Sequence, residues 1–346
     1  MKKILLILCT ALFITGCAVS DTGSSDMDIL TLFSSNSNAA NKAWVGTFQL
    51  VFNDMKDKVL KLDKIEFVGE QPTKELIGLN KEEFNSSMLD PETYYTSYGP
   101  TSPKARDTIK KDIKEKFDET SDLIDALDWK EVKGRYYAYA MLKKEFEFLR
   151  EFDKLDPRSF NNSAEKYDFF GIKNHSELLA KNIRVLFYDS PDDFALQLLT
   201  KGNDTVYLYR TESEDSFDKI YKKMLKSTDN YKDSKHLLDD DTFLAPNLKF
   251  KSKRNYAELC NKIIKNTDGY YFSMALETLQ FELNNKGGKI KSEAVIMADA
   301  TAIAFEDEPK PRHFDFDKTF VMFLVDKGKT DPYFALRVKD LKNLNK

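Results

Sequence analysis

Residues of the types that carry enzymatic chemistry are sparse in this sequence. The three histidines, His175, His236 and His313, stand far apart, and none has a Cys or His at a metal-ligand spacing. We interpret them as surface or hydrogen-bonded residues. The sequence contains neither a Gly-x-Ser-x-Gly nucleophile motif nor a glycine-rich phosphate loop. These observations predict that the chain is not an enzyme and holds no metal and no cofactor.

Two further candidates have plainer interpretations. The run Asp239-Asp240-Asp241 could attract a cation, but it lacks the spaced ligands and the glycine of a calcium loop, so we expect a solvated acidic loop. Cys260 belongs to a segment whose apolar residues follow helical spacing, with no histidine nearby. We therefore expect Cys260 to be a small buried residue rather than a nucleophile.

Composition narrows the class of protein. The 346 residues include 53 Lys and Arg against 57 Asp and Glu, which gives a net charge of −4, and 41% are hydrophobic. This apolar share excludes a disordered chain. The absence of a basic excess argues against a nucleic-acid partner. The length suits one large domain or two smaller ones, and we expect a monomer.

The N-terminal residues resemble a bacterial lipoprotein signal. Lys2 and Lys3 precede an apolar stretch of about a dozen residues, which is too short to span a hydrocarbon layer ~30 Å thick. The stretch ends in Ile14-Thr15-Gly16-Cys17, which is similar to a lipobox. We expect a signal peptide over residues 1–16, a lipidated Cys17, a polar tether over 17–40, and attachment to the extracytoplasmic face of the cell membrane.

Hydrophobic periodicity predicts the elements of the remaining chain, residues 41–346. Helices are expected over 41–60, from Ser102-Pro103 through Phe117, over 216–225 and over 256–265. Strands are expected within 136–152, over 243–250 and 279–283, in a hairpin over 194–209, and in a closing hairpin over 314–338. Between Lys286-Gly287-Gly288 and Phe314 lies a stretch with few turn signals, and such long connections usually carry function.

The order of these segments resembles the serpin family. The resemblance is carried by Asn41-x-x-Trp-x-x-x-Phe48, Tyr139–Phe152, Phe194–Tyr209, Ala245–Phe250, Leu279–Gly287 and Phe314–Val338. The chain differs from the family at Phe148, Thr319 and Leu336, where the family has Trp, Pro and Gly. The resemblance implies an α+β fold with a large central mixed β-sheet, additional sheets, about eight helices and an exposed reactive-centre-like loop.

The resemblance also implies a mechanism, in which the cleaved loop inserts into the central sheet as a new strand. Such a strand needs alternate residues that fit a buried face. Every second residue from Gly288 to Ala304 is small or apolar, whereas the other parity holds every charge from 289 to 299. The same alternation also occurs in an ordinary edge strand. The resemblance makes Gly287 and Gly288 the hinge and 294–304 the insertable strand.

Two alignments of the loop place the scissile bond near Ala300-Thr301 or near Ala304-Phe305, so the bait lies within 300–306 and includes Glu306. Lys310 and Arg312 would suit a trypsin-like enzyme, but prolines flank both. The first hypothesis is inhibition of a serine or cysteine protease. The second is a non-inhibitory serpin-fold lipoprotein that binds another extracytoplasmic protein or acts as a scaffold. A third is an unrelated α+β lipoprotein that binds a ligand.

Overall fold

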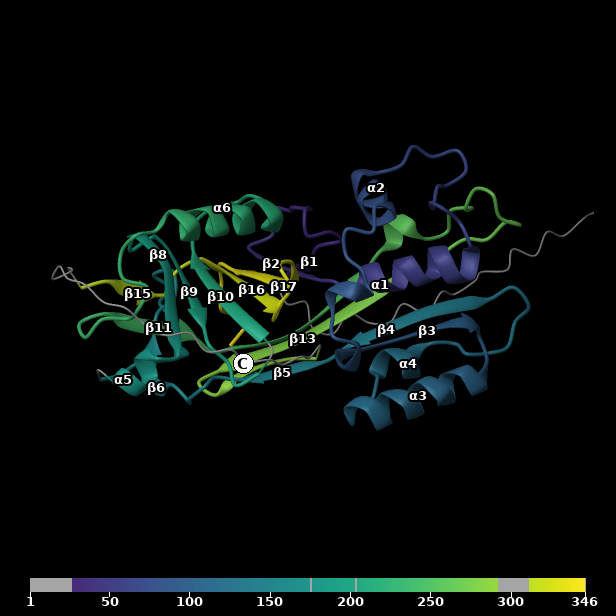
Figure 1. Cartoon of the computed structure of the whole chain (residues 1–346). Coiled ribbons are helices and arrows are strands. Elements are labelled where there is room, and N and C mark those ends of the chain that lie inside the picture. Colours follow the sequence, from purple (N-terminus) through teal and green to yellow (C-terminus); the bar gives the residue numbers. More distant parts are fainter. Residues whose placement is uncertain (1–26, 175, 203, 292–310, 346) are drawn as a thin grey trace, which may run out of the picture.

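The computed structural model describes residues 27–174, 176–202, 204–291 and 311–345. Seventeen strands and six α-helices lie in these ranges, together with one short π-helix and three 3₁₀ turns. The predicted α+β class is confirmed, although about eight helices were expected and the described ranges contain six α-helices. Figure 1 shows the strands concentrated at one end and the helices α1 to α4 gathered at the other.

The largest sheet has seven strands and contains the predicted hairpin over 194–209 as well as the closing hairpin, which begins at Phe320 and not at Phe314, because residues 313–315 form β15 in another sheet. Its order is β1 (Met27–Ile29), β2 (Asn41–Val45), β17 (Pro332–Val338), β16 (Phe320–Asp326), β10 (Asp204–Arg210), β9 (Asp193–Leu198) and β8 (Ile183–Ser190). All residues of β2, β16 and β17 are buried. Residues 320–325 of β16 and 332–336 of β17 therefore form continuous apolar runs, because both faces of these strands are covered.

Three smaller sheets complete the strand arrangement. One has the order β15 (His313–Asp315), β11 (Thr242–Pro246), β7 (Tyr167–Gly171) and β6 (Asp153–Arg158). A second has the order β12 (Leu248–Asn255), β13 (Leu276–Asn284), β14 (Gly287–Ile290) and β5 (Lys144–Glu147). The third pairs β3 (Tyr94–Pro100) with β4 (Tyr136–Leu142). Lys143 alone separates β4 from β5, so these two strands form one nearly continuous line.

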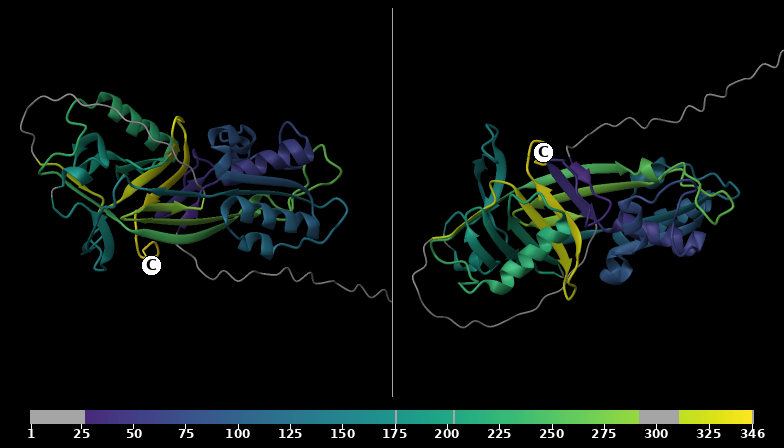
Figure 2. Two further views of the ribbon diagram at one scale, coloured as in Figure 1. Left: turned by 60° about the horizontal axis from the view of Figure 1, so that its bottom comes forward. Right: turned by 90° about the horizontal axis from the view of Figure 1, so that it is seen from above.

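Local sequence signals explain the helices that form as expected. Ser102 accepts a hydrogen bond from the N–H of Ala105 at 3.0 Å and caps α3 (Pro103–Phe117), which has proline at its first position. Its buried residues are Ile109, Ile113 and Phe117. The helix predicted over 216–225 is confirmed as α6 (Phe217–Asn230), which covers the seven-stranded sheet (Figures 1 and 2). The other helices are α1 (Thr47–Asp54), α2 (Lys74–Asn80), α4 (Asp122–Ala126) and α5 (Glu177–Ala180).

Three expectations are corrected. Residues 41–45 form strand β2, so the helix expected over 41–60 begins only at Thr47 and becomes a π-helix at Met55. The segment 256–265 has a single 3₁₀ turn instead of a helix, because its backbone bonds cross to Phe272 and Tyr270 instead of running within the segment. The polar tether expected over 17–40 does not reach residue 40, since β1 pairs with β2 and Ile29, Leu30 and Leu32 are buried.

The helices and the remaining loops form two smaller cores beside the main one. One core joins α1 and α2 to the segment 256–264 around Phe48, Phe52 and Tyr256. The other packs α3 and α4 against β3 and β4 through residues that include Ile113, Ile124 and Trp129. In Figure 1, α1 lies on one side of β3 and β4, and α3 and α4 lie on the other side.

Candidate functional site

The strand that follows the glycine pair lies between two other strands. β14 pairs with β13 on one side, with Ile290 opposite Phe281, and with β5 on the other side, with Ile290 opposite Lys144. Both pairings are antiparallel, so β13 and β5 run in the same direction. Gly288 and Ile290 are buried and Lys289 is exposed, which confirms the predicted alternation for this short described part.

Gly287 fits its place because it has no side chain. Its φ is +154°, and a Cβ atom there would lie 2.0 Å from the carbonyl oxygen of Phe146. Both the backbone angle and the close approach of β5 therefore require glycine. The predicted hinge residues Gly287 and Gly288 belong to a paired, buried strand.

Charges alternate across the outer face of this sheet. Lys249 of β12 lies opposite Glu282 of β13, which lies opposite Lys289 of β14, which lies opposite Glu145 of β5. The ion pairs Lys249–Glu282 and Lys289–Glu145 measure 3.8 and 3.9 Å. β14 thus places a cation between two carboxylates, which would be like-charged neighbours if β13 and β5 paired directly.

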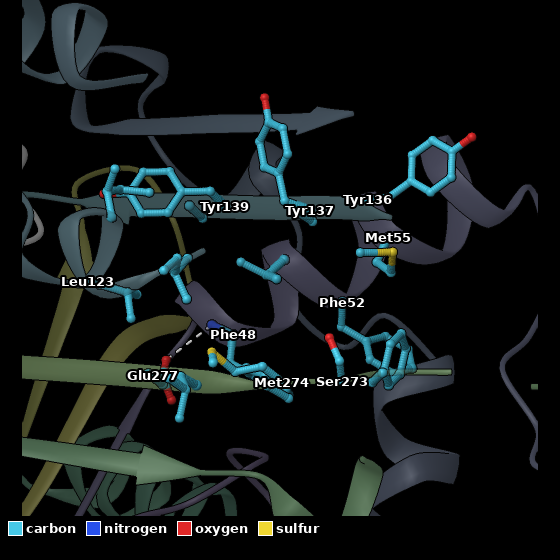
Figure 3. A pocket seen from close by; sticks show the side chains of 18 of the residues that line it. Phe48, Phe52, Met55, Leu123, Tyr136, Tyr137, Tyr139, Ser273, Met274 and Glu277 are labelled. Carbon is cyan, nitrogen blue, oxygen red and sulfur yellow. Dashed lines mark hydrogen bonds between the residues drawn. The ribbon is translucent and has the colours of Figure 1, made fainter. Parts of the chain in front are cut away.

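A cleft of about 370 Å³ continues the line of β14. One wall is β4, and the opposite wall is the beginning of β13; within the described ranges no ladder joins the two strands. Figure 3 shows Tyr136, Tyr137 and Tyr139 on one wall and Glu277 on the other, with Phe48 of α1 between them. Its principal apolar lining is Phe48, Val51, Phe52, Met55, Leu123, Leu127, Tyr136, Tyr137, Phe272 and Met274.

Glu277 is the buried acid of this cleft. It lies on the inward parity of β13 with Leu279 and Phe281, and its carboxylate accepts hydrogen bonds from the N–H of Phe48 at 3.1 Å and from the hydroxyl of Tyr256 at 2.7 Å. Burial raises the pKa of Glu277 to about 7, and the two hydrogen bonds oppose the rise. Because Phe48 is in the first turn of α1, the carboxylate also complements the positive end of that helix.

The second buried charged group is Lys144 of β5, the strand that pairs with β14. The Lys144 ammonium pairs with Asp204 at 3.1 Å and with Asp326, and it sits 3.9 Å from the ring centroid of Tyr333. The Tyr333 hydroxyl donates to the same oxygen of Asp204 at 2.6 Å, while the other oxygen of Asp204 has no hydrogen-bond partner among the described residues. Burial raises the pKa of Asp204 to about 6, against the attraction of Lys144. This cluster joins β5 to the ends of β10, β16 and β17.

The remaining predicted site residues are distributed as follows. Cys17 and the bait residues Ala300, Thr301, Ala304, Phe305 and Glu306 lie outside the described residues. Arg312 is buried and donates to Asp241 at 2.7 Å, to the Tyr231 hydroxyl at 2.9 Å and to the backbone oxygens of Ser234 and His236. Because these groups hold the Arg312 guanidinium, it could reach the specificity pocket of a protease only if the surrounding structure opened.

The histidines, the acidic run and Cys260 show no arrangement for catalysis among the described residues. His175 lies outside the described residues, whereas His236 and His313 are exposed. Asp241 belongs to the Arg312 ion pair, so the acidic run is only in part a solvated loop. Cys260 is half-buried, because its segment crosses the surface instead of forming a helix. In the described ranges no three His, Cys, Asp or Glu side chains are grouped to hold a metal, and no helix there has the length and apolarity to cross a membrane.

Sequence reasoning missed Glu277 and Lys144. Both carry a charge at an inward position of an alternating strand: Glu277 precedes Leu279, Phe281 and Leu283, and Lys144 precedes Phe146. A single charge on the apolar parity is a signal for a buried ionic group. Finding it requires the correct strand boundaries, and the predicted strand began at residue 279.

Comparison with known proteins gives structural similarities only. No family model matches the chain. No curated protein matches it. Among solved structures it is similar to Serpin48 of the insect Tenebrio molitor, with 14% identity, a TM-score of 0.41, and coverage of 74% of this chain and 79% of that one. It is also similar to cleaved Serpin 42Da, with 11% identity, a TM-score of 0.48 and the same two coverages.

Human thyroxine-binding globulin in complex with its hormone is a third similar structure, with 10% identity, a TM-score of 0.41, and coverage of 72% of this chain and 77% of that one. All three likenesses are distant, since each TM-score is below 0.5. The chain is thus similar to serpin structures over about three quarters of its length, and its function has to be argued from its own sheet, cleft and charges.

Proposed function

We propose that this chain is a serpin-like protein whose connection 291–312 is cleaved by a target serine or cysteine protease and then extends β14 into the neighbouring cleft, which inhibits that protease. The observation that carries the proposal is the position of β14 between β5 and β13. A sheet that has already accepted four residues of the segment has the spacing and strand directions needed for the residues that follow.

The register of β14 defines where those residues would go. Ile290 lies opposite Phe281 and Lys144, so a continued strand would place Ser292 opposite Leu279 and Leu142, and Ala294 opposite Glu277 and Ala140. Small side chains at the inward positions suit a cleft whose floor is filled by Phe48 and Val51. The strand would gain backbone hydrogen bonds on both edges and bury apolar surface, which together favour insertion.

Thermal unfolding of the cleaved chain tests the proposal. Cleavage within 295–306 is expected to raise the midpoint of thermal unfolding by more than about ten degrees. An additional strand paired on both edges should add several kcal/mol to the free energy of unfolding through hydrogen bonds and apolar burial. The variant Ala294→Asp places a carboxylate on the inward parity opposite Glu277 and should abolish the rise. Its matched control, Val295→Asp, changes the outward parity and should retain it. Cleavage that leaves all three midpoints unchanged contradicts insertion.

Inhibition needs a separate measurement, since insertion alone does not prove trapping. A protease that is trapped should appear on a denaturing gel as a covalent complex with this chain, and Ala294→Asp should turn the inhibitor into a simple substrate. Serine and cysteine proteases that prefer a small residue before the scissile bond suit both bait alignments, because each bond follows an alanine. Insertion without any covalent complex favours the second candidate function.

The second candidate is a non-inhibitory serpin-fold protein that binds a ligand or partner. The observation in its favour is the aromatic cleft itself, whose volume of about 370 Å³ falls in the range of small-molecule sites. Its charged lining residues are Glu277 at one wall and the ion pair of Asp128 with Arg135. A ligand of this cleft should raise the unfolding temperature of the uncleaved chain and lose affinity in Phe52→Ser.

Membrane attachment through Cys17 is part of the same proposal. The lipobox-like run before Cys17 supports it, and two or more acyl chains would hold the chain at the extracytoplasmic face. Metabolic labelling with palmitate should mark the wild type and not Cys17→Ser. Equal labelling of the two chains contradicts the anchor without bearing on strand insertion.

A further inference from the structure

The connection between α3 and α4 lies against the end of β14. Lys291, the residue after this strand, donates from Nζ to the backbone oxygen of Thr120 at 3.1 Å and forms an ion pair with Glu119. Both side chains are about three-quarters buried, with exposed fractions of 24% for Lys291 and 26% for Glu119. The contact with Thr120 therefore spans 171 residues of sequence at the point where the strand ends.

Glu119 is held from a second side by the residue that joins β4 to β5. The Nζ of Lys143 lies 3.1 Å from the Glu119 carboxylate and donates to the backbone oxygen of Phe117 at 2.9 Å, at the end of α3. Burial raises the pKa of Glu119, but the hydrogen bonds from Lys291 and Lys143 outweigh burial and leave the pKa lowered. One carboxylate thus joins β14, the β4–β5 junction and the connection before α4.

The position of this carboxylate matters because α4 lies over the cleft. Leu123 and Ile124 of α4 line the cleft, and Trp129 lines it as well while donating from its ring N–H to the backbone oxygen of Ile124 at 2.8 Å. Lys291 shares the outward parity of Lys289, and Glu119 lines one surface depression with Lys143, Glu145, Lys289 and Lys291. The contact therefore fixes the end of β14 to the connection that leads into α4, beside the place where a strand extended beyond Lys291 would run.

We propose that Glu119 and Lys291 form an ionic clip that holds the end of β14 against the α3–α4 connection and that must open before the sheet extends into the cleft. The inference rests on the proposed strand insertion for its biological purpose, but the clip itself is a property of the uncleaved chain. Glu119 and Lys291 are positioning residues in this scheme, and neither reacts with the protease.

The outer-face pair Lys289–Glu145 provides an internal contrast. It joins β14 to β5 at 3.9 Å, with exposed fractions of 66% and 46%, so solvent screens it and side-chain entropy opposes it. The Glu119 clip is more buried and is shared by two lysines. Removing the clip should consequently have the larger effect on the local opening of β14.

Hydrogen exchange in the intact, uncleaved chain tests the clip directly. Glu119→Gln and Lys291→Gln are each expected to speed exchange of the β14 amides by about tenfold, because local opening no longer breaks a partly buried ion pair. The double variant should exchange within about twofold of either single variant, since both changes remove the same contact. The control Lys289→Gln removes the exposed Lys289–Glu145 pair and leaves Glu119 and its two lysines in place, so exchange should remain within about twofold of the wild type.

The rate of strand insertion supplies a second readout. Trp129 is one of only two tryptophans in the chain, so a change in its fluorescence after loop cleavage should follow the displacement of α4, with Trp44→Phe as background. The rate should rise about tenfold in Glu119→Gln and stay unchanged in Lys289→Gln.

The two readouts separate the clip from the function proposed above. Exchange that is equal in Glu119→Gln, Lys291→Gln and wild type overturns the clip, whatever the fluorescence shows. Faster exchange without insertion in any variant supports the clip and counts against the insertion function. Faster exchange with an unchanged insertion rate overturns the statement that the clip must open before the sheet extends.

Discussion

The backbone N–H of Phe48 donates to the carboxylate of Glu277 at 3.1 Å, which ties the first turn of α1 to β13 across the floor of the cleft. The Tyr256 ring stacks on Phe48 with centroids 3.7 Å apart, and its hydroxyl donates to the other carboxylate oxygen. A single acid therefore fixes a helix, a strand and an aromatic pair at the place where the sheet is incomplete.

This arrangement predicts a pH dependence of stability. Glu277 has a pKa of about 7 in the folded chain, above its ordinary value of 4.5, so the folded state binds its proton more tightly than the unfolded state. The free energy of unfolding should then fall as the pH rises from about 4.5 through 7. The contribution of this fully buried group is roughly 3 kcal/mol at most. Urea denaturation at about pH 5.5 and about pH 8 measures it.

The variant Glu277→Gln should flatten part of this dependence, with its oxygen accepting from the Phe48 N–H and its amide nitrogen donating to the Tyr256 hydroxyl. Asp204, with a pKa raised to about 6, contributes in the same direction and keeps the remainder. Glu282→Gln, on the outward face of the same strand, serves as the control and should follow the wild-type profile. If Glu277→Gln keeps the full wild-type slope of unfolding free energy against pH, the dependence comes from groups other than Glu277.

The buried Lys144 cluster predicts a large loss of stability when its cation is removed. Lys144→Met leaves Asp204 and Asp326 buried without their counter-ion, which should cost about 3–5 kcal/mol near neutral pH. The loss should shrink at about pH 5, where Asp204 takes up a proton. Adding Asp204→Asn to Lys144→Met should restore part of the stability, and equal losses in the single and double variants would refute the pairing.

Gly287 predicts a local backbone effect. Gly287→Ala should cost about 3 kcal/mol and abolish protection of the β14 amides, because the new Cβ would meet the Phe146 carbonyl. Gly269→Ala is the matched control: its φ is also positive, at +81°, but no atom lies within 4 Å of the new Cβ. The control should show only the strain of a left-handed residue, about 1–2 kcal/mol. Similar losses in both variants would mean that β5 does not approach Gly287.

Arg312 predicts resistance to proteolysis. Native chain should not be cut by trypsin after Arg312, because its guanidinium is occupied by Asp241, Tyr231 and two carbonyl groups. Arg312→Met should destabilise the chain by about 3 kcal/mol, since Asp241 is left buried and unpaired. Rapid cleavage after Arg312 in folded wild type, judged by the mass of the fragments, would place this residue in an accessible loop instead.

Local signals predicted much of the fold. The Ser102-Pro103 cap marks the start of its helix, and the apolar runs on either side of Lys201-Gly202 and over 320–325 mark their strands. The segment 256–265 was misread because Tyr256 and Leu259 are buried at helical spacing by chance, while Ile263 is exposed beside Tyr271. Its conformation depends on strands distant in sequence.

The site could be predicted only in part for the same reason. The alternation at Gly288 and Ile290 was visible in the sequence, but the insertion of β14 between β5 and β13 joins residues about 140 positions apart. The roles of Glu119 and Glu277 likewise depend on contacts with Lys291 and Phe48, and no local pattern reports such pairs.

The alternating charges of Lys249, Glu282, Lys289 and Glu145 restrict which strand can pair at the position of β14. A peptide or neighbouring chain that tries to occupy the position of β14 must offer a cation where Lys289 stands, since an acidic residue there would face two carboxylates. The position between β13 and β5 therefore favours pairing with this chain's own segment over pairing with an acidic strand from another molecule.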